Sequence, residues 1–222
     1  MANHLRKELD KLNQQLLALG NAVEETLEKS VRSLLSASIA LAREVVEADN
    51  EIDEREVDIE EECLKILALY QPVAIDLRYI VAVMKINSDL ERIGDLAVSI
   101  ALKSEYLAGL APSQFVQDIS GMADAARQML RQSIESFVNQ DADLARRVCR
   151  QDDVIDQLHS SIRERIESSI RGDVDRVDEY LRLIGISRNL ERVADHATNI
   201  AEDTVYLREG QIVRHRLEAA ES

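Results

Sequence analysis

The chain has little of what builds sheets, tight loops or disulfide-stabilised folds. Its 222 residues include no Trp, two Pro, seven Gly and two Cys, and aromatic residues make up 3%. Hydrophobic residues at 45% and charged residues at 31% are typical of long helices that bury one face. We see no β-strand pattern and no low-complexity segment. These proportions predict an all-α protein of one or two domains.

The two cysteines, Cys63 and Cys149, are far apart and belong to no C-x-x-C motif. This usage predicts a reduced, intracellular protein. No apolar run approaches the roughly 20 residues that a membrane-spanning helix needs. The first residues lead directly into a charged helix, which predicts that there is no signal peptide. We therefore expect a cytoplasmic protein that does not insert into a membrane.

Positive charge is also scarce. The 27 Lys and Arg residues are outnumbered by 42 Asp and Glu residues, which gives a formal charge of −15 and a pI near 4.7. A nucleic acid or an anionic membrane surface binds to a basic face, so the composition argues against both as direct partners. The acidic excess is compatible with bound cations and equally with solubility alone.

Apolar residues recur at alternating spacings of four and three from Leu5 onward, which is the pattern of helices packed in a bundle. Because the pattern continues through Leu34, Leu41 and Val45, we predict one long first helix and a turn at 48–50, with Asp49 as a candidate N-cap. The first predicted helix spans about 3–46, and the second runs from the end of that turn to about residue 70. The other four span about 72–108, 113–148, 152–170 and 174–209, and residues 211–222 form a frayed helical tail.

The chain repeats itself. Residues 89–103 and 189–203 share one frame, in which Glu91 and Asp95 correspond to Glu191 and Asp195. Upstream, Asp49 and Asp53 correspond to Asp152 and Asp156. A period of about 100 residues fits a duplicated small domain. We predict two tandem antiparallel three-helix bundles, at 1–109 and 110–222, joined near residues 109–112.

The acidic residues lie at equal distances from the predicted turns of two helical hairpins. Such residues end up level in an antiparallel pair, so Asp53 should face Glu91, and Asp49 should face Asp95. In the second repeat, Asp156 should likewise face Glu191, and Asp152 should face Asp195. Each hairpin would then hold four carboxylates together, which is unfavourable without a counter-charge.

Two sources of counter-charge remain as alternatives. Arg92 and Arg192 provide one, and bound cations provide the other. Asp49 and Asp152 also have the simpler interpretation of helix N-caps. Carboxylates and amides are hard ligands, which suit Fe, Mn, Mg or Ca and do not exclude Zn. The candidate metal ligands are Asp49, Asp53, Glu91, Asp95, Asp152, Asp156, Glu191, Asp195 and Asn199, with Asn87 and Glu202 as further oxygen donors.

Histidine adds little to this pattern. His159 lies one turn from Asp156, and His196 adjoins Asp195 but points about 100° away around the helix, so both are interpreted as surface histidines. No helix carries the Glu-x-x-His motif of a di-iron carboxylate enzyme, and no phosphate loop, nucleophile elbow or Cys–His pair is present. We expect no enzyme, although a carboxylate-bridged metalloenzyme of ferritin-like type and a metal-free helical scaffold stay open as alternatives.

The segments DLERIGDLAVSIALKSEYL and NLERVADHATNIAEDTVYL, with the acidic pair ahead of each, closely resemble the PhoU family over essentially the whole chain. The resemblance implies a non-enzymatic negative regulator of phosphate uptake at the cytoplasmic side of the phosphate ABC transporter. Its implied partners are the transporter ATPase subunit and a sensor histidine kinase. The resemblance also implies metal clusters on the paired acidic motifs, that is, on the eight carboxylates named above. The long apolar first helix makes a homodimer plausible.

The two repeats differ beside their acidic motifs. The first has Leu96, Ser99 and Leu102 where the second has His196, Asn199 and Glu202. Since the first copy offers fewer donors, we predict that the second site binds metal more tightly. Titration of the two halves with a divalent cation measures this order, and tighter binding by the N-terminal half would contradict it.

Overall fold

The computed structural model describes residues 2–111 and 113–210, which form six α-helices and no strands. The helices are α1 (Ala2–Leu35), α2 (Ile39–Tyr70), α3 (Ala74–Leu107), α4 (Val116–Asn139), α5 (Ala142–Ile170) and α6 (Val177–Glu209), and a 3-10 turn, η1 (Val174–Arg176), precedes α6. The all-α prediction is confirmed. The predicted tail at 211–222 lies outside the described residues. None of the described helices is both long and apolar enough to cross a bilayer.

The first turn lies at 36–38, so the predicted turn at 48–50 is wrong. Ala37 has a positive φ of 48°, and the Ser38 hydroxyl caps α2 by accepting from the backbone N–H of Leu41 at 3.3 Å. The sequence Ser-Ala-Ser contains no Gly or Pro to mark this turn. Leu34 and Leu41 are seven residues apart, so the apolar pattern keeps its phase across the break.

The corresponding turn of the second repeat was misplaced in the same way. Helix α4 ends at Asn139 and not near 148, Gln140 has a φ of 51°, and Asp141 caps α5. The Asp141 carboxylate accepts from the N–H groups of Asp143 and Leu144 at 3.0 and 2.9 Å. Asp49 and Asp152 therefore lie well inside α2 and α5, and the N-cap interpretation of both residues is wrong.

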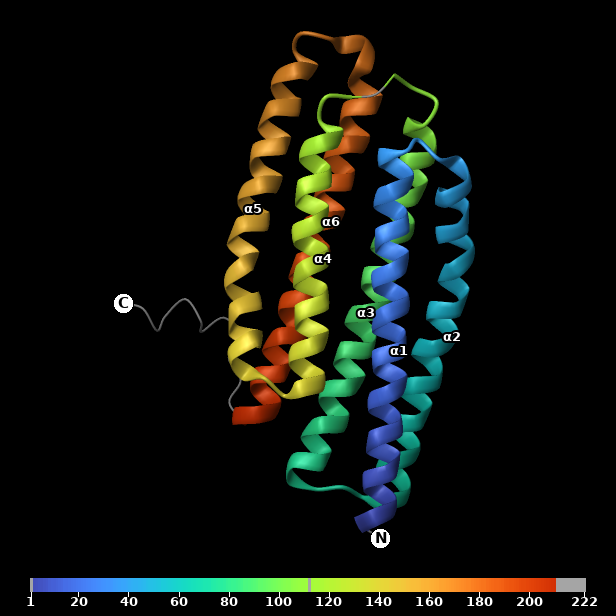
Figure 1. The fold of residues 1–222 in the computed structure, drawn as a ribbon, viewed down its shortest axis with the longest axis vertical. Helices are drawn as coiled ribbons and strands as arrows, with labels where there is room; N and C mark the ends of the chain where they lie inside the picture. The colour runs from blue at the N-terminus through green and yellow to red at the C-terminus, as the bar shows by residue number, and fades with distance from the viewer. Residues whose placement is uncertain (1, 112, 211–222) are drawn as a thin grey trace, which may run out of the picture.

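Each repeat is an antiparallel three-helix bundle, and the two bundles lie side by side (Figure 1). Helix α3 packs against α6 and α1 packs against α4 across the junction. Leu90 and Leu190, at matching places in α3 and α6, are fully buried in one continuous apolar core. Burial of one such side chain contributes about 1.5–3 kcal/mol. The domain boundary near residue 109 stays a prediction.

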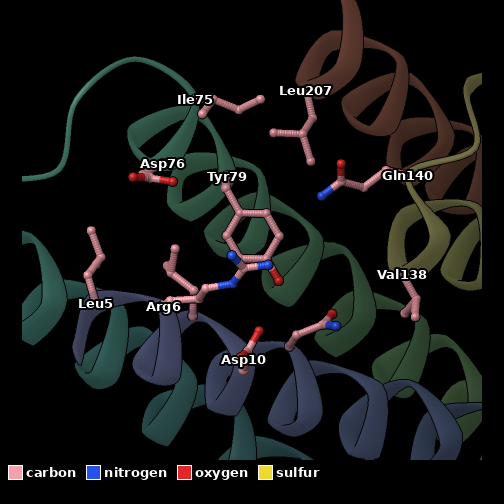
Figure 2. A pocket seen from close by; sticks show the side chains of 11 residues that line it. Leu5, Arg6, Asp10, Ile75, Asp76, Tyr79, Val138, Gln140 and Leu207 are labelled. Carbon is pink, nitrogen blue, oxygen red and sulfur yellow. The ribbon is translucent and has the colours of Figure 1, made fainter. Parts of the chain in front are cut away.

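A pocket opens where the ends of four helices meet. Figure 2 shows Leu5, Arg6 and Asp10 of α1 on one side and Tyr79 of α3 in the centre, with Leu207 of α6 opposite. Burial raises the pKa of Tyr79 above its ordinary value, so this phenol stays neutral. None of the predicted metal ligands lines this pocket, so it is separate from the candidate site.

Gly20 allows the close approach of α1 to α4. A Cβ at this position would lie 2.8 Å from Cδ1 of Ile134, a residue of α4 that is only 8% exposed. By contrast, a Cβ at Gly121, also within α4, would meet no atom within 4 Å. The two glycines therefore differ in the packing against them.

Replacing Gly20 with Val forces two methyl groups into this contact. We expect Gly20→Val to lower the free energy of unfolding by about 1–3 kcal/mol through overpacking. As a control, Gly121→Ala should raise it by about 0.5–1 kcal/mol, because a helix-interior glycine is replaced without a clash. Urea denaturation of the two variants measures both changes. Wild-type stability in Gly20→Val would contradict the packing of α1 on α4.

Candidate metal centres

The α2–α3 hairpin brings the first four predicted carboxylates together. Burial and the charges of Asp53 and Asp95 raise the pKa of Asp49. Burial and the nearby charge of Asp95 likewise raise the pKa of Glu91, and Asp53 adds to this. Gly94 of α3 lies beside the Asp49 carboxylate, since a Cβ there would be 3.3 Å from Cγ2 of Ile52 and 3.7 Å from Oδ1 of Asp49.

The α5–α6 hairpin builds the same arrangement. Burial, followed by the charges of Asp195 and Asp156, raises the pKa of Asp152 from 3.8 to about 6. Burial and the neighbouring carboxylates also raise the pKa values of Glu191 and Asp195. Exposure follows the duplication: Asp49, Asp152, Glu91 and Glu191 are half-buried, and Asp53, Asp156, Asp95 and Asp195 are exposed. Both hairpins thus hold carboxylates in one another's field.

The two clusters differ in their counter-charge. In the first, Arg92 Nη1 lies 3.2 Å from Asp95 Oδ2, and Arg92 Nε lies 3.4 Å from Glu91 Oε2. No ion pair within 4 Å reaches the second cluster from any residue in the described ranges, although the Thr198 hydroxyl partly offsets the raised pKa of Asp152 and the charge of Arg192 partly offsets those of Glu191 and Asp195. Arginine therefore forms ion pairs with the first cluster and acts on the second only from a greater distance.

The side chain of Asn199 does not have the partners that the sequence predicted. Its Nδ2 donates to Oδ1 of Asp89 at 3.3 Å, and Nδ1 of His196 lies 2.8 Å from the same oxygen. Because Asp89 belongs to α3, both side chains are turned toward the neighbouring repeat. Two of the three donors that motivated tighter binding at the second site, His196 and Asn199, are therefore engaged across the junction. The predicted order of affinity keeps its direction, because Arg92 already occupies the first cluster.

Two side chains beside the clusters were missed or misjudged. Nδ2 of Asn87 donates to Oε1 of Glu56 at 3.1 Å, and the charge of Glu56 acts on Glu91. His159, interpreted as a surface residue, is half-buried with Nδ1 3.0 Å from the Ser187 hydroxyl. Glu56 follows Asp53 by three residues, as His159 follows Asp156. The offset of 103 residues that relates Asp53 to Asp156 also relates Glu56 to His159. Extending the alignment of the repeats by three residues therefore points to both side chains.

The donor set has the chemistry of a site for hard cations, although the site is not pre-assembled. Every residue of the two quartets is a carboxylate, and such oxygens bind Mg²⁺, Ca²⁺, Mn²⁺ or iron. Yet within residues 2–111 and 113–210, no three His, Cys, Asp or Glu side chains are close enough to hold one ion. Like charges repel one another when no cation lies between them, so an ion would have to draw these side chains closer together. A cation would be most favourable beside Asp152, because burial and the charges of Asp195 and Asp156 raise the pKa of this carboxyl to about 6.

The arrangement of two repeats, each with one acidic quartet, has a match among protein families. The family model for the PhoU domain matches residues 16–103 and again 119–204, and each match contains one complete quartet. The chain belongs to the PhoU family. A PhoU homolog of Aquifex aeolicus, named a phosphate-specific transport system accessory protein, is 38% identical over 212 residues, which is 96% of each chain. A Thermotoga maritima homolog with the same description is 35% identical and spans 99% of this chain and 95% of its own.

Solved PhoU structures share the fold. The crystal structure of PhoU from Pseudomonas aeruginosa superposes with a TM-score of 0.89 at 35% identity, covering 93% of this chain and 99% of that one. The phosphate transport system regulatory protein PhoU from Streptococcus pneumoniae gives 0.87 at 30% identity, over 94% and 99% of the two chains. The likeness extends over both repeats, so the PhoU assignment applies to the chain as a whole.

Asp152 provides a test of the electrostatics. Since its folded pKa of about 6 exceeds the ordinary 3.8, folding favours the protonated form, and this stabilisation is lost as the pH rises through about 6. Without metal, we expect Asp152→Asn to raise the free energy of unfolding near neutral pH by about 1 kcal/mol, a figure that allows for solvent screening of a half-exposed group.

The gain should shrink toward about pH 4, where the wild-type carboxyl is largely protonated. Denaturant titrations in a chelator at several pH values measure it. The control is Asp153→Asn, which removes the same charge from an exposed neighbour. An equal gain from both substitutions, or no dependence on pH, would contradict the crowding of carboxylates around Asp152.

Proposed function

We propose that this chain regulates phosphate uptake and phosphate-starvation signalling as a helical adaptor. In this role it binds the ATPase subunit of the phosphate ABC transporter and the sensor histidine kinase, in the cytoplasm and as a homodimer. The supporting observation is similarity over nearly the full length to relatives named phosphate-specific transport system accessory proteins. The action is stoichiometric binding, because neither quartet is accompanied by the Glu-x-x-His motif of a di-iron enzyme.

Metal binding is part of the proposal. Asp152, Asp156, Glu191 and Asp195 would hold cations in the second hairpin, and Asp49, Asp53, Glu91 and Asp95 would do so in the first. A bound cation supplies the positive charge that offsets carboxylate repulsion. With that repulsion offset, the α2–α3 and α5–α6 faces keep a fixed shape for a partner to recognise. The shared core of the two repeats makes the full-length chain, and not its halves, the material for measuring the two affinities.

Co-purification tests the adaptor role. We expect the tagged full-length protein to retain the ATPase subunit of its own organism's phosphate transporter. Glu91→Ala together with Glu191→Ala should weaken this binding by about tenfold or more, since one half-buried carboxylate is removed from each candidate face. The readout is the amount of ATPase subunit retained at a fixed bait concentration.

The control replaces Glu135 and Glu164, which are exposed on α4 and α5 and carry the same charge. This variant should bind like the wild type. If the wild-type protein retains no ATPase subunit, the adaptor role is wrong. Equal losses in both double variants would instead leave the acidic quartets without a role in docking.

A further inference from the structure

The contact between α3 and α6 joins the two repeats along antiparallel polar stripes, which we call the α3–α6 seam. At one end of the seam, Lys85 Nζ lies 3.0 Å from Asp203 Oδ1, and that carboxylate is almost fully buried. One turn away, Asp89 accepts from Asn199 and lies 2.8 Å from His196. Acidic side chains therefore accept the hydrogen bonds of the basic and amide groups at this end.

The opposite end of the seam is basic. Lys103 lies over Gly185, where a Cβ would come within 2.9 Å of the lysine Cε. One turn away, the Arg182 guanidinium stacks 3.5 Å from the centre of the Tyr106 ring. Neither Lys103 nor Arg182 takes part in an ion pair with any described residue. Two cations thus lie side by side without a carboxylate between them.

Comparison of the repeats identifies what this end lacks. At the repeat offset of 100 residues, Lys103 occupies the position of Asp203, and Asn189 occupies the position of Asp89. Both acids that accept hydrogen bonds at one end are therefore replaced by donors at the other. The backbones at the two ends of the seam are related by approximate two-fold symmetry, but the charges of their side chains are not.

Several donors at the basic end have no acceptor. Nε of Arg182 and Nδ2 of Asn189 are buried without a hydrogen-bond partner among the described residues, and Asn189 is only 8% exposed. The ammonium of Lys103 donates to the carbonyl oxygen and the hydroxyl of Ser99 at 3.1 and 2.6 Å, which leaves its third N–H free. Burial and the charge of Arg182 lower the pKa of Lys103. Buried donors left without acceptors are destabilising, typically by about 1–3 kcal/mol each.

The register of the seam brings these donors within about two helical turns of one another. Lys85 pairs with Asp203, Lys103 with Gly185 and Arg182 with Tyr106. The same antiparallel register places Asn189 opposite Ser99, one turn from the pair formed by Lys103 and Gly185. Donors from both repeats therefore line one stretch of the seam.

We propose that the basic end of the α3–α6 seam binds a small inorganic oxyanion of the phosphate class, held by Lys103, Arg182 and Asn189. Arginine and lysine form their strongest hydrogen bonds with such oxygens. The anion takes the place of the missing acids, so it links α3 to α6 as Asp203 does at the other end. None of its ligands belongs to the acidic quartets, so the site requires neither bound metal nor the proposed docking partners.

Direct binding to the full-length protein tests this site. The probes are inorganic phosphate, with sulfate as a second oxyanion and chloride at equal ionic strength as the blank, measured by equilibrium dialysis or calorimetry in the presence of a chelator. We expect one saturable site for phosphate per chain and none for chloride. Lys103→Met and Arg182→Met should each weaken binding by at least about tenfold, the effect of losing one charged hydrogen bond. Gly185→Ala should also weaken it, because the new Cβ displaces Lys103.

Lys29→Met provides the control, since it removes one positive charge from α1 that is already paired with Glu25 at 2.8 Å. It should leave phosphate affinity unchanged, and Lys103→Arg, which keeps the charge, should retain most of it. Melting temperatures without phosphate establish that every variant folds. Saturable sulfate binding that depends on Lys103 and Arg182 supports an oxyanion site. No saturable phosphate binding, or equal affinity in the wild type and both Met variants, would overturn the proposal, and neither result bears on co-purification with the transporter ATPase subunit.

Discussion

The constraint on which the structure depends is repulsion between carboxylates that two helical hairpins hold level. Helix packing sets the register of α2 with α3 and of α5 with α6, because Ile52 and Ile155 are buried one residue ahead of Asp53 and Asp156. The apolar core therefore decides where the acids lie, whatever the electrostatic cost. Their raised pKa values express that cost, and a cation between the helices would offset it.

The duplication makes the two repeats nearly symmetric, and the positions where they differ in charge are those with a proposed chemical role. Arg92 pairs with the first quartet, and no counterpart pairs with the second among the described residues. At the junction of the repeats, Asp203 and Lys103 hold equivalent places with opposite charge. A shared core makes the two bundles one mechanical unit. An ion bound at the seam would therefore act on both hairpins, which is a physical basis for communication between the two acidic quartets.

The sequence predicted the fold class, the repeats and which carboxylates lie within one another's field, because these depend on spacing within one chain. That each quartet holds an ion stays a prediction. It misplaced the first turn of each repeat, since Ser36-Ala37-Ser38 breaks the helix without breaking the apolar pattern. Packing between repeats, which no spacing reveals, decides the orientation of Asn199 and His196 toward Asp89. The hydrogen bond that orients His159 was missed because its partner, Ser187, comes from the next helix.

The metal content of the intact protein tests whether cations offset the repulsion within the two quartets. Full-length protein purified without chelator is analysed by elemental mass spectrometry, next to a variant in which the four carboxylates of the second hairpin become carboxamides. We expect bound metal in the wild type, a clear loss of metal in the variant, and a higher melting temperature of the wild type when the cation is restored. A metal-free wild-type protein whose melting temperature does not respond to Mg²⁺, Ca²⁺, Mn²⁺, Zn²⁺ or iron would contradict this expectation.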